Sequence, residues 1–273
     1  LEELSRDLVL ALEQGELTVA LTPERLAAAQ ASGWLEGDAS PLLLQGDRLG
    51  WRRWLQAMEQ VVAELVERAH APVPKPVKAV DPELSDRLNA EQCAAVRALD
   101  QASVVLLSGG PGTGKTSTVV EILARAEARH PGLRIGLAAP TGKAARRLGE
   151  AVMAQRAPLP CSTLHRWLEA GSRGFGRHRQ RPLELDLLVI DEMSMLDLAL
   201  TQALLEALPS GCRLLLVGDP AQLPPVGSGA VWHRLQQPDV RGRFGAGAVH
   251  LERTYRNRGA LAQVAQQLRQ GNL

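Results

Sequence analysis

A glycine-rich stretch that follows a short apolar run constrains this chain more than any other feature. Residues 109–116 read GGPGTGKT, which fits the phosphate-binding pattern G-x-x-x-x-G-K-S/T, and the apolar residues 104–107 precede them. Glycines in such a loop let backbone N–H groups converge on phosphate oxygens, and the helix that follows adds the positive end of its dipole. The pattern therefore predicts a buried strand, a nucleoside triphosphate site and a helix over residues 118–129, in that order.

The positions of this loop have separate predicted roles. Lys115 is expected to reach the β- and γ-phosphates, and the hydroxyl of Thr116 to bind Mg²⁺. The alternative is a glycine-rich turn that binds nothing, but such a turn does not require the strand and helix that flank this one. The predicted nucleotide-binding residues of the loop are Gly109, Gly110, Pro111, Gly112, Thr113, Gly114, Lys115 and Thr116.

Two carboxylates follow a second apolar run. Residues 187–190 predict a buried strand, and Asp191 and Glu192 come directly after it. Asp191 is placed to hold Mg²⁺, and Glu192 to orient or deprotonate the attacking water. Acidic pairs after buried strands are common, but one downstream of a phosphate-binding loop in the same sheet is rarely accidental.

Two more segments carry candidate residues for the γ-phosphate. Gln222 follows the apolar run 214–217, and its neutral amide suits a sensor that changes partners after hydrolysis. An arginine near the γ-phosphate would stabilise the charge that develops there. The residues alone do not choose among Arg253, Arg256 and Arg258 for that role.

The order of apolar runs and helical stretches predicts the fold class. From residue 104 onward the two alternate, which is typical of an α/β fold with a parallel sheet. We expect strands at residues 104–107, 134–138, 187–190, 214–217 and 249–251. Ligands of such sheets bind at the carboxyl ends of the strands, where the unusual residues of this sequence lie.

A proline-spaced segment, APVPKP at residues 71–76, divides the chain. The predicted domains are a small, mainly helical N-terminal domain at residues 1–71, a linker at 72–82 and an ATPase domain at 83–273. A short hairpin is expected within residues 41–50. Trp34, Trp51 and Trp54 are predicted to fill a small core, a more common role than stacking on nucleic-acid bases.

Composition narrows the function classes. The formal net charge is +1, so any surface that binds nucleic acid must be local. Cys93, Cys161 and Cys212 lie far apart, which fits a reducing cytosol and neither a disulfide framework nor a zinc site. No apolar run approaches membrane-spanning length and no signal-peptide pattern opens the chain, so we expect a cytoplasmic protein without membrane contact. Leu1 is not an initiator methionine, and we expect a longer parent protein.

Two polar helix starts and one loop are candidates for contact with nucleic acid. The segments PTGK at 140–143 and STLHR at 162–166 combine hydroxyl and basic groups where phosphate is readily bound, although ordinary helix capping explains them equally well. The basic, glycine-rich loop 171–181 either touches nucleic acid or is the solvated tip of a hairpin. Taken alone, His165 is more often a structural histidine.

Together these motifs resemble those of superfamily 1 DNA helicases, most closely the RecD family, the alpha subunit of exodeoxyribonuclease V. The resemblance spans residues 88–257. It implies a RecA-like P-loop NTPase domain that uses ATP and Mg²⁺, in a family that moves 5′ to 3′ along DNA beside RecB-like and RecC-like subunits. The stretches that carry it are LNAEQ, GGPGTGKT, APTGKAARRL, STLHRWL, LLVIDEMSM, VGDPAQLPPVGSGAV and LERTYRN.

The resemblance also implies roles that the residues alone leave open. It makes Gln92 an adenine contact, whereas Gln92 taken alone reads as a surface residue. It makes Gln222 the γ-phosphate sensor and Arg256 the arginine beside the γ-phosphate. The contacts that it implies to single-stranded DNA are Pro140, Thr141, Lys143, Thr163 and His165.

One departure and two alternatives accompany the resemblance. Such helicases have two RecA-like domains, and we see the motifs of one, so we expect residues 1–273 alone to bind ATP without unwinding DNA. A stand-alone superfamily 1 helicase is the first alternative. The second is a module that binds nucleotide only to assemble a nuclease complex, but such a switch does not need the carboxylate of Glu192.

Overall fold

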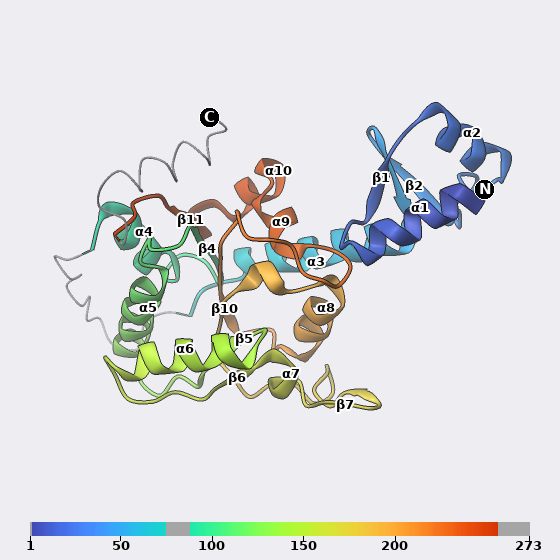
Figure 1. Ribbon diagram of the computed structural model, residues 1–273. Coiled ribbons are helices and arrows are strands. Elements are labelled where there is room, and N and C mark those ends of the chain that lie inside the picture. Colours follow the sequence, from blue (N-terminus) through green and yellow to red (C-terminus); the bar gives the residue numbers. More distant parts are fainter. Residues whose placement is uncertain (1, 75–87, 256–273) are drawn as a thin grey trace.

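The N-terminal part of the chain forms a small lobe around its own core. The computed structural model describes residues 2–74 and 88–255 (Figure 1). Residues 2–51, here called the N-terminal lobe, contain a three-stranded antiparallel sheet in the order β1-β3-β2, and its core includes Leu8, Leu42 and Leu49. The elements are α1 (Glu2–Glu13), β1 (Thr18–Ala20), α2 (Pro23–Ala31), β2 (Leu42–Gln45) and β3 (Arg48–Trp51). The expected hairpin at 41–50 is confirmed, whereas β1 had no counterpart among the predicted elements.

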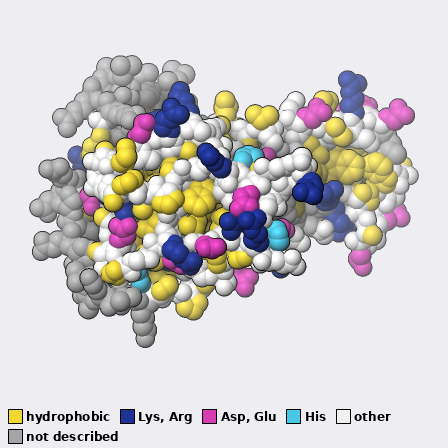
Figure 2. Space-filling view, turned by 90° about the horizontal axis from the view of Figure 1, so that it is seen from below, with side chains coloured by type: hydrophobic (Ala, Val, Ile, Leu, Met, Phe, Trp, Pro, Cys, Tyr) yellow, Lys and Arg dark blue, Asp and Glu magenta, His cyan; other side chains and the backbone are white. Residues whose placement is uncertain are grey.

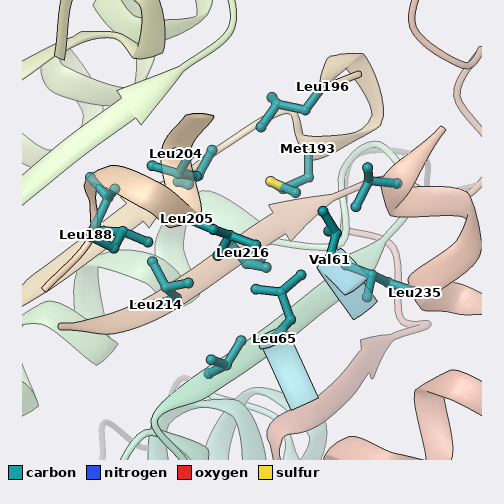
Figure 3. Close-up of a cluster of buried hydrophobic side chains, with 14 of the residues drawn as sticks. Val61, Leu65, Leu188, Met193, Leu196, Leu204, Leu205, Leu214, Leu216 and Leu235 are labelled. Atoms are coloured by element: carbon teal, nitrogen blue, oxygen red, sulfur yellow. The ribbon is translucent and has the colours of Figure 1, made fainter. Parts of the chain in front are cut away.

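A long helix, α3 (Arg52–His70), leads from this lobe to the main body and packs on its sheet. Val61 and Leu65 of α3 lie in the same apolar cluster as Leu214 and Leu216 of the sheet (Figure 3). The predicted division of the chain at residue 71 stays a prediction. Any such division must accommodate a helix whose buried face belongs to the core of the main body.

The main body is built on a six-stranded sheet in the order β11-β4-β10-β9-β5-β6. Every neighbouring pair in it is parallel. The strands are β4 (Val104–Gly109), β5 (Ile135–Ala139), β6 (Cys161–Thr163), β9 (Leu187–Ile190), β10 (Arg213–Gly218) and β11 (Ala248–Leu251). The predicted α/β P-loop fold with a parallel sheet is confirmed, and all five expected strands are present.

Helices cover both faces of the sheet, which explains why its strands are apolar along their whole length. In β4, Val104 and Leu106 face one core, while Val105 and Leu107 face the other. The first core is covered by α3, α8 (Leu198–Ala207) and α9 (Val231–Gln236), with α7 (Leu164–Trp167) and α10 (Pro238–Arg241) at its margin. The second core is covered by α4 (Ala90–Ala98), α5 (Lys115–Arg129) and α6 (Gly142–Met153).

Strand β6 is the element of the sheet that the sequence did not predict. Its residues, Cys161, Ser162 and Thr163, are only half-buried, because β6 is an edge strand that pairs with β5 alone. A polar edge strand of this length lacks the apolar run that marks the central strands. The expectation that this segment begins a helix holds only at Thr163, which caps α7.

Candidate nucleotide site

The carboxyl ends of the parallel strands are aligned at one edge of the sheet. Ile190 of β9 pairs with Leu216 of β10 on one side and with Ala138 of β5 on the other. Ser108 of β4 pairs with Gly218 of β10. The polar segments that follow these strands therefore emerge together, where ligands of open α/β sheets bind.

Two glycines of the phosphate-binding loop are required by its geometry. Gly114, which precedes α5, has a left-handed φ of 86°. A Cβ atom there would lie 2.6 Å from Nε2 of Gln92, and a Cβ on Gly109 would lie 2.7 Å from Oγ1 of Thr113. Side chains at these positions would collide with Gln92, Thr113 and Leu251, so the loop keeps this path only with glycine there.

Lys115, the first residue of α5, folds back over the loop. Its Nζ donates hydrogen bonds to the carbonyl oxygens of Gly109 at 2.6 Å and Gly110 at 3.1 Å. The Thr113 hydroxyl donates to the Gly110 carbonyl at 2.9 Å, and Thr116 is exposed one residue further along the helix. An ammonium group and a helix start thus meet at the open side of the loop, as anion binding requires.

Asp191 follows β9 in a half-buried position next to these cationic groups. Burial raises the pKa of its carboxyl group, and the charge of Glu192 adds to that rise. The backbone N–H of Glu192, which donates to Oδ1 at 2.9 Å, and the positive charges of Lys115 and Arg147 act in the opposite direction. A carboxylate held in this way gains from a bound cation.

Glu192 has an uncommon backbone conformation. Its φ of 56° lies in the left-handed region, where a side chain other than that of glycine costs about 1–3 kcal/mol. Strain of this kind persists where the surrounding structure imposes it, often at functional sites. This conformation ends the extended path of β9, so the chain turns at Glu192, immediately beyond Asp191.

Gln222 is joined to the segment that follows the two carboxylates. Its Oε1 accepts a hydrogen bond of 2.7 Å from the hydroxyl of Ser194, which is buried in the turn η1 (Met193–Met195). The sequence reasoning did not identify Ser194. The one available signal was a serine between two methionines after the acidic pair, a polar group that needs a partner once it is buried.

Gln92 is buried, so its interpretation as a surface residue is wrong. Its Oε1 accepts from the backbone N–H of Asn89 at 3.0 Å, and its own N–H donates to Oδ1 of Asn89 at 2.8 Å, a capping box at the start of α4. Tyr255 completes the cluster, because its hydroxyl contacts both side chains and its N–H donates to the carbonyl of Gly112 at 2.8 Å. Tyr255 was missed, and Arg256 lies outside the described residues.

The residues expected to contact DNA lie at the β5–β6 end of the same sheet edge. Oγ1 of Thr141 caps α6 by accepting from Ala144, and Oγ1 of Thr163 caps α7 by accepting from Arg166. Pro140 is half-buried, and the side chains of Lys143 and His165 are exposed. The capping explanation is therefore confirmed for the two threonines, while the DNA contacts stay a prediction.

The basic loop 171–181 begins with a two-stranded hairpin of β7 (Ala170–Gly171) and β8 (Gly174–Phe175). Glu169 forms ion pairs with Arg177 at 2.8 Å and Arg181 at 2.6 Å, so two of the arginines are already neutralised. On the face that Figure 2 shows, Lys and Arg side chains lie among Asp and Glu side chains and do not form one continuous basic surface.

The donor set of the loop and of Asp191 fits Mg²⁺ held together with a nucleotide. Within residues 2–74 and 88–255, no three His, Cys, Asp or Glu side chains gather into a metal-binding group. Mg²⁺ in phosphoryl-transfer sites takes one or two carboxylates and completes its shell with phosphate and water, and Thr116 and Asp191 suit that mode. In the part of the chain that the structure describes, no helix has the length and apolarity to cross a membrane.

Known proteins are similar to this chain in sequence. The family model described as "AAA domain" matches residues 92–228. An "ATP-dependent RecD2 DNA helicase" of Deinococcus radiodurans is 47% identical over 142 residues, which cover 52% of this chain and 19% of that protein. A "RecBCD enzyme subunit RecD" of Mycolicibacterium smegmatis is 37% identical over 273 residues, covering 92% of this chain and 48% of that protein. The resemblance to the RecD family is thereby confirmed.

Two facts qualify the extent of the likeness. The chain spans about half the length of the mycobacterial relative and about a fifth of the Deinococcus one. Among solved structures, a Pif1 helicase from Candida albicans has a TM-score of 0.48 at 23% identity, over 69% of this chain and 45% of that one.

Proposed function

This chain belongs to the AAA domain family, and we propose that it is the ATP-hydrolysing motor domain of a RecD-like, 5′ to 3′ DNA helicase subunit. One observation carries the proposal. The phosphate-binding loop follows β4 and Asp191 follows β9, and both strands pair in parallel with β10, so the loop and the carboxylate emerge at the same edge of the sheet. A nucleotide-binding group and a metal-binding carboxylate at one sheet edge are the minimum that hydrolysis of ATP requires.

The residues divide the chemistry between binding and hydrolysis. The loop N–H groups and Lys115 hold the β- and γ-phosphates, and Gln92 contacts the adenine. Thr116 and Asp191 would hold Mg²⁺, which offsets the negative charge of the phosphates when it is bound. Glu192 orients the attacking water or takes its proton, and Gln222 bonds the γ-phosphate. Arg256 is assigned to the transition-state charge on the resemblance alone.

Single-stranded DNA is the proposed second ligand. Pro140, Thr141, Lys143, Thr163 and His165 line the β5–β6 end of the sheet edge that also carries the nucleotide site. The ring of His165 lies 6.4 Å from that of Phe175, so two rings that can stack on bases lie near each other at this end. The names of the relatives support RecB-like and RecC-like partners. A role in recombination and double-strand break repair and a cytoplasmic location complete the proposal and rest on the resemblance to the RecD family.

The proposal is tested by the dependence of DNA affinity on nucleotide. A motor must bind DNA with different affinities in its nucleotide-free and nucleotide-bound states. We expect a labelled oligonucleotide of mixed sequence to bind the 273-residue chain at low salt, with an affinity that changes when Mg²⁺ and a non-hydrolysable ATP analogue are added. Lys115→Ala should bind DNA as tightly as the nucleotide-free wild type does, and its DNA affinity should no longer change when the analogue is added. A chain that binds the analogue but no DNA would support the assembly-module alternative.

A further inference from the structure

We propose that the N-terminal lobe positions the loop that carries Gln222 and so takes part in ATP turnover. The inference rests on the proposed function of Gln222. The two contacting segments are residues 12–15, here called the lobe turn, and residues 219–229, here called the Gln222 loop. The lobe thereby acquires a role for which its own sequence gives no chemical motif.

Two hydrogen bonds join the lobe turn to the end of the Gln222 loop. The backbone N–H of Gly229 donates to the carbonyl of Gly15 at 3.0 Å, and the hydroxyl of Ser228 donates to the carbonyl of Leu12 at 2.9 Å. Both acceptors are backbone groups at the end of α1. The contact therefore depends on the path of the lobe backbone and on one side chain, that of Ser228.

The lobe turn fits closely against the loop. Gly15 has a left-handed φ of 84°, and a Cβ atom on it would lie 3.0 Å from the carbonyl oxygen of Pro225. Both the conformation and the space thus favour glycine at this position. A larger residue would push the lobe turn and the Gln222 loop apart.

The middle of the Gln222 loop has little support of its own. The side chains of Leu223 and Val226 are 86% and 94% exposed. The loop is held near its start by the bond from Ser194 to Gln222, and at its end by the lobe turn and by the N–H of Leu198, which donates to the Ser228 carbonyl at 3.1 Å. Apart from Pro225, which is buried, the middle of the loop is exposed, so the shape of the loop depends on where its two ends and Pro225 are held.

Hydrogen bonds at the two ends of the Gln222 loop, together with the loop backbone between them, connect the lobe to the segment that carries the carboxylates. From the lobe turn the path runs through Ser228 and the Gln222 loop to Gln222, and from there through Ser194 to the turn that follows Glu192. Ser228 and Gly15 are positioning residues in this scheme, because neither touches nucleotide. Coupling is reciprocal, so nucleotide binding should also alter the lobe turn.

Hydrogen exchange and kinetics on the 273-residue chain test this path. The variant is Ser228→Ala, with Ser228→Thr as the version that keeps the hydroxyl. Ser32→Ala is the matched control, since the Ser32 hydroxyl also donates to a backbone carbonyl of the lobe, that of Ala29 at 2.8 Å, but does not reach the Gln222 loop. The readouts are exchange at the Gly229 amide and in residues 12–16, MgATP affinity, and kcat.

Without nucleotide, we expect the Gly229 amide to exchange faster in Ser228→Ala than in the wild type. In the wild type, an ATP analogue should alter amide exchange in residues 12–16, and Ser228→Ala should lose this effect. Its kcat should fall several-fold at unchanged MgATP affinity, and Ser228→Thr should restore both. Wild-type exchange and kcat in Ser228→Ala, or equal effects of Ser32→Ala, would overturn the proposal. Failure of the wild type to bind MgATP would instead refute the proposed function, and faster exchange at Gly229 would still establish the contact.

Discussion

Asp191 is the residue of the site whose carboxyl pKa is raised by burial. Burial raises the pKa of its carboxyl group from the ordinary 3.8, even though Lys115 and Arg147 lie near enough to act against that rise. The nearby positive charge of the protein is thus too small to compensate for burial. A divalent cation bound there would supply the missing charge, because metal and proton compete for the same carboxylate.

This competition predicts a pH dependence of Mg²⁺ binding. The raised pKa means that Asp191 takes up a proton at higher pH than an exposed aspartate, so its contribution to Mg²⁺ affinity is lost as pH falls through the raised value. In Asp191→Asn, Mg²⁺-dependent ATP binding should be weaker at neutral pH and should show only the pH dependence of the nucleotide itself. Calorimetric titration at several pH values measures both. An unchanged pH profile in the variant would remove Asp191 from the metal site.

Folding stability depends on the charge of Asp191 in the opposite direction from Mg²⁺ affinity. A carboxyl group whose pKa is higher in the folded than in the unfolded state favours folding when protonated, and this contribution is lost as pH rises through the folded pKa. Without Mg²⁺, Asp191→Asn should therefore unfold at a higher denaturant concentration than the wild type at neutral pH. If Asp191→Asn instead unfolds at a lower denaturant concentration than the wild type, the charged Asp191 carboxylate stabilises the fold and the prediction is wrong.

The sequence could predict those site residues whose chemistry lies within one short segment. The roles proposed for Lys115 and Thr116 follow from spacing, because strand, loop and helix are consecutive. The burial of Gln92 could not be predicted, since it depends on a contact with Tyr255 from the far end of the described chain. The same holds for Ser194, whose partner Gln222 belongs to another loop.

At the scale of elements, α3 is the helix whose packing has the clearest energetic consequence. Leu65 is 1% exposed within the main core (Figure 3), so Leu65→Ala should lower the free energy of unfolding by about 2–5 kcal/mol. Leu44→Ala, at a position 44% exposed in the lobe, is the control. Urea unfolding compares the two. Equal effects would mean that α3 contributes little to the core of the sheet.

The start of α6 is the element on which the DNA proposal depends most. Lys143 is the second residue of this helix and is exposed. Lys143→Ala should weaken binding to single-stranded DNA and reduce the slope of log affinity against log salt by roughly 0.7. Arg97→Ala, which removes an exposed cation from α4, should leave the slope unchanged. An unaltered slope for Lys143→Ala would exclude Lys143 from the DNA contacts.

Strands could be predicted from the sequence where consecutive residues are all buried and apolar. The four residues of β9 are all buried and apolar, and the strand has the predicted bounds. β6 and β1 were not predicted, because each has three residues and is stabilised by the neighbouring strand with which it pairs. Their formation depends on tertiary contacts that the local pattern does not contain.

At the scale of the whole molecule, one sheet edge collects segments that are far apart in the chain. The position of β4 between β10 and β11 could not be predicted from the sequence, because alternation predicts a parallel sheet and not the order of its strands. That order places the phosphate-binding loop, Asp191 and Gln222 together. The N-terminal lobe reaches the same edge through its hydrogen bonds to the Gln222 loop.

The central claim is that different residues at this edge of the sheet are responsible for nucleotide binding and for hydrolysis. Comparing MgATP affinity with turnover in Lys115→Ala and Glu192→Gln tests it most directly. Loss of the Lys115 charge should weaken MgATP affinity by about 10- to 100-fold and abolish turnover, since hydrogen bonds to charged groups contribute about 1.5–3 kcal/mol. Glu192→Gln should keep wild-type affinity and lose turnover by about 10²- to 10⁴-fold, because the carboxylate acts only on the water. Equal losses of affinity in both variants, or turnover that survives in Glu192→Gln, would contradict the account.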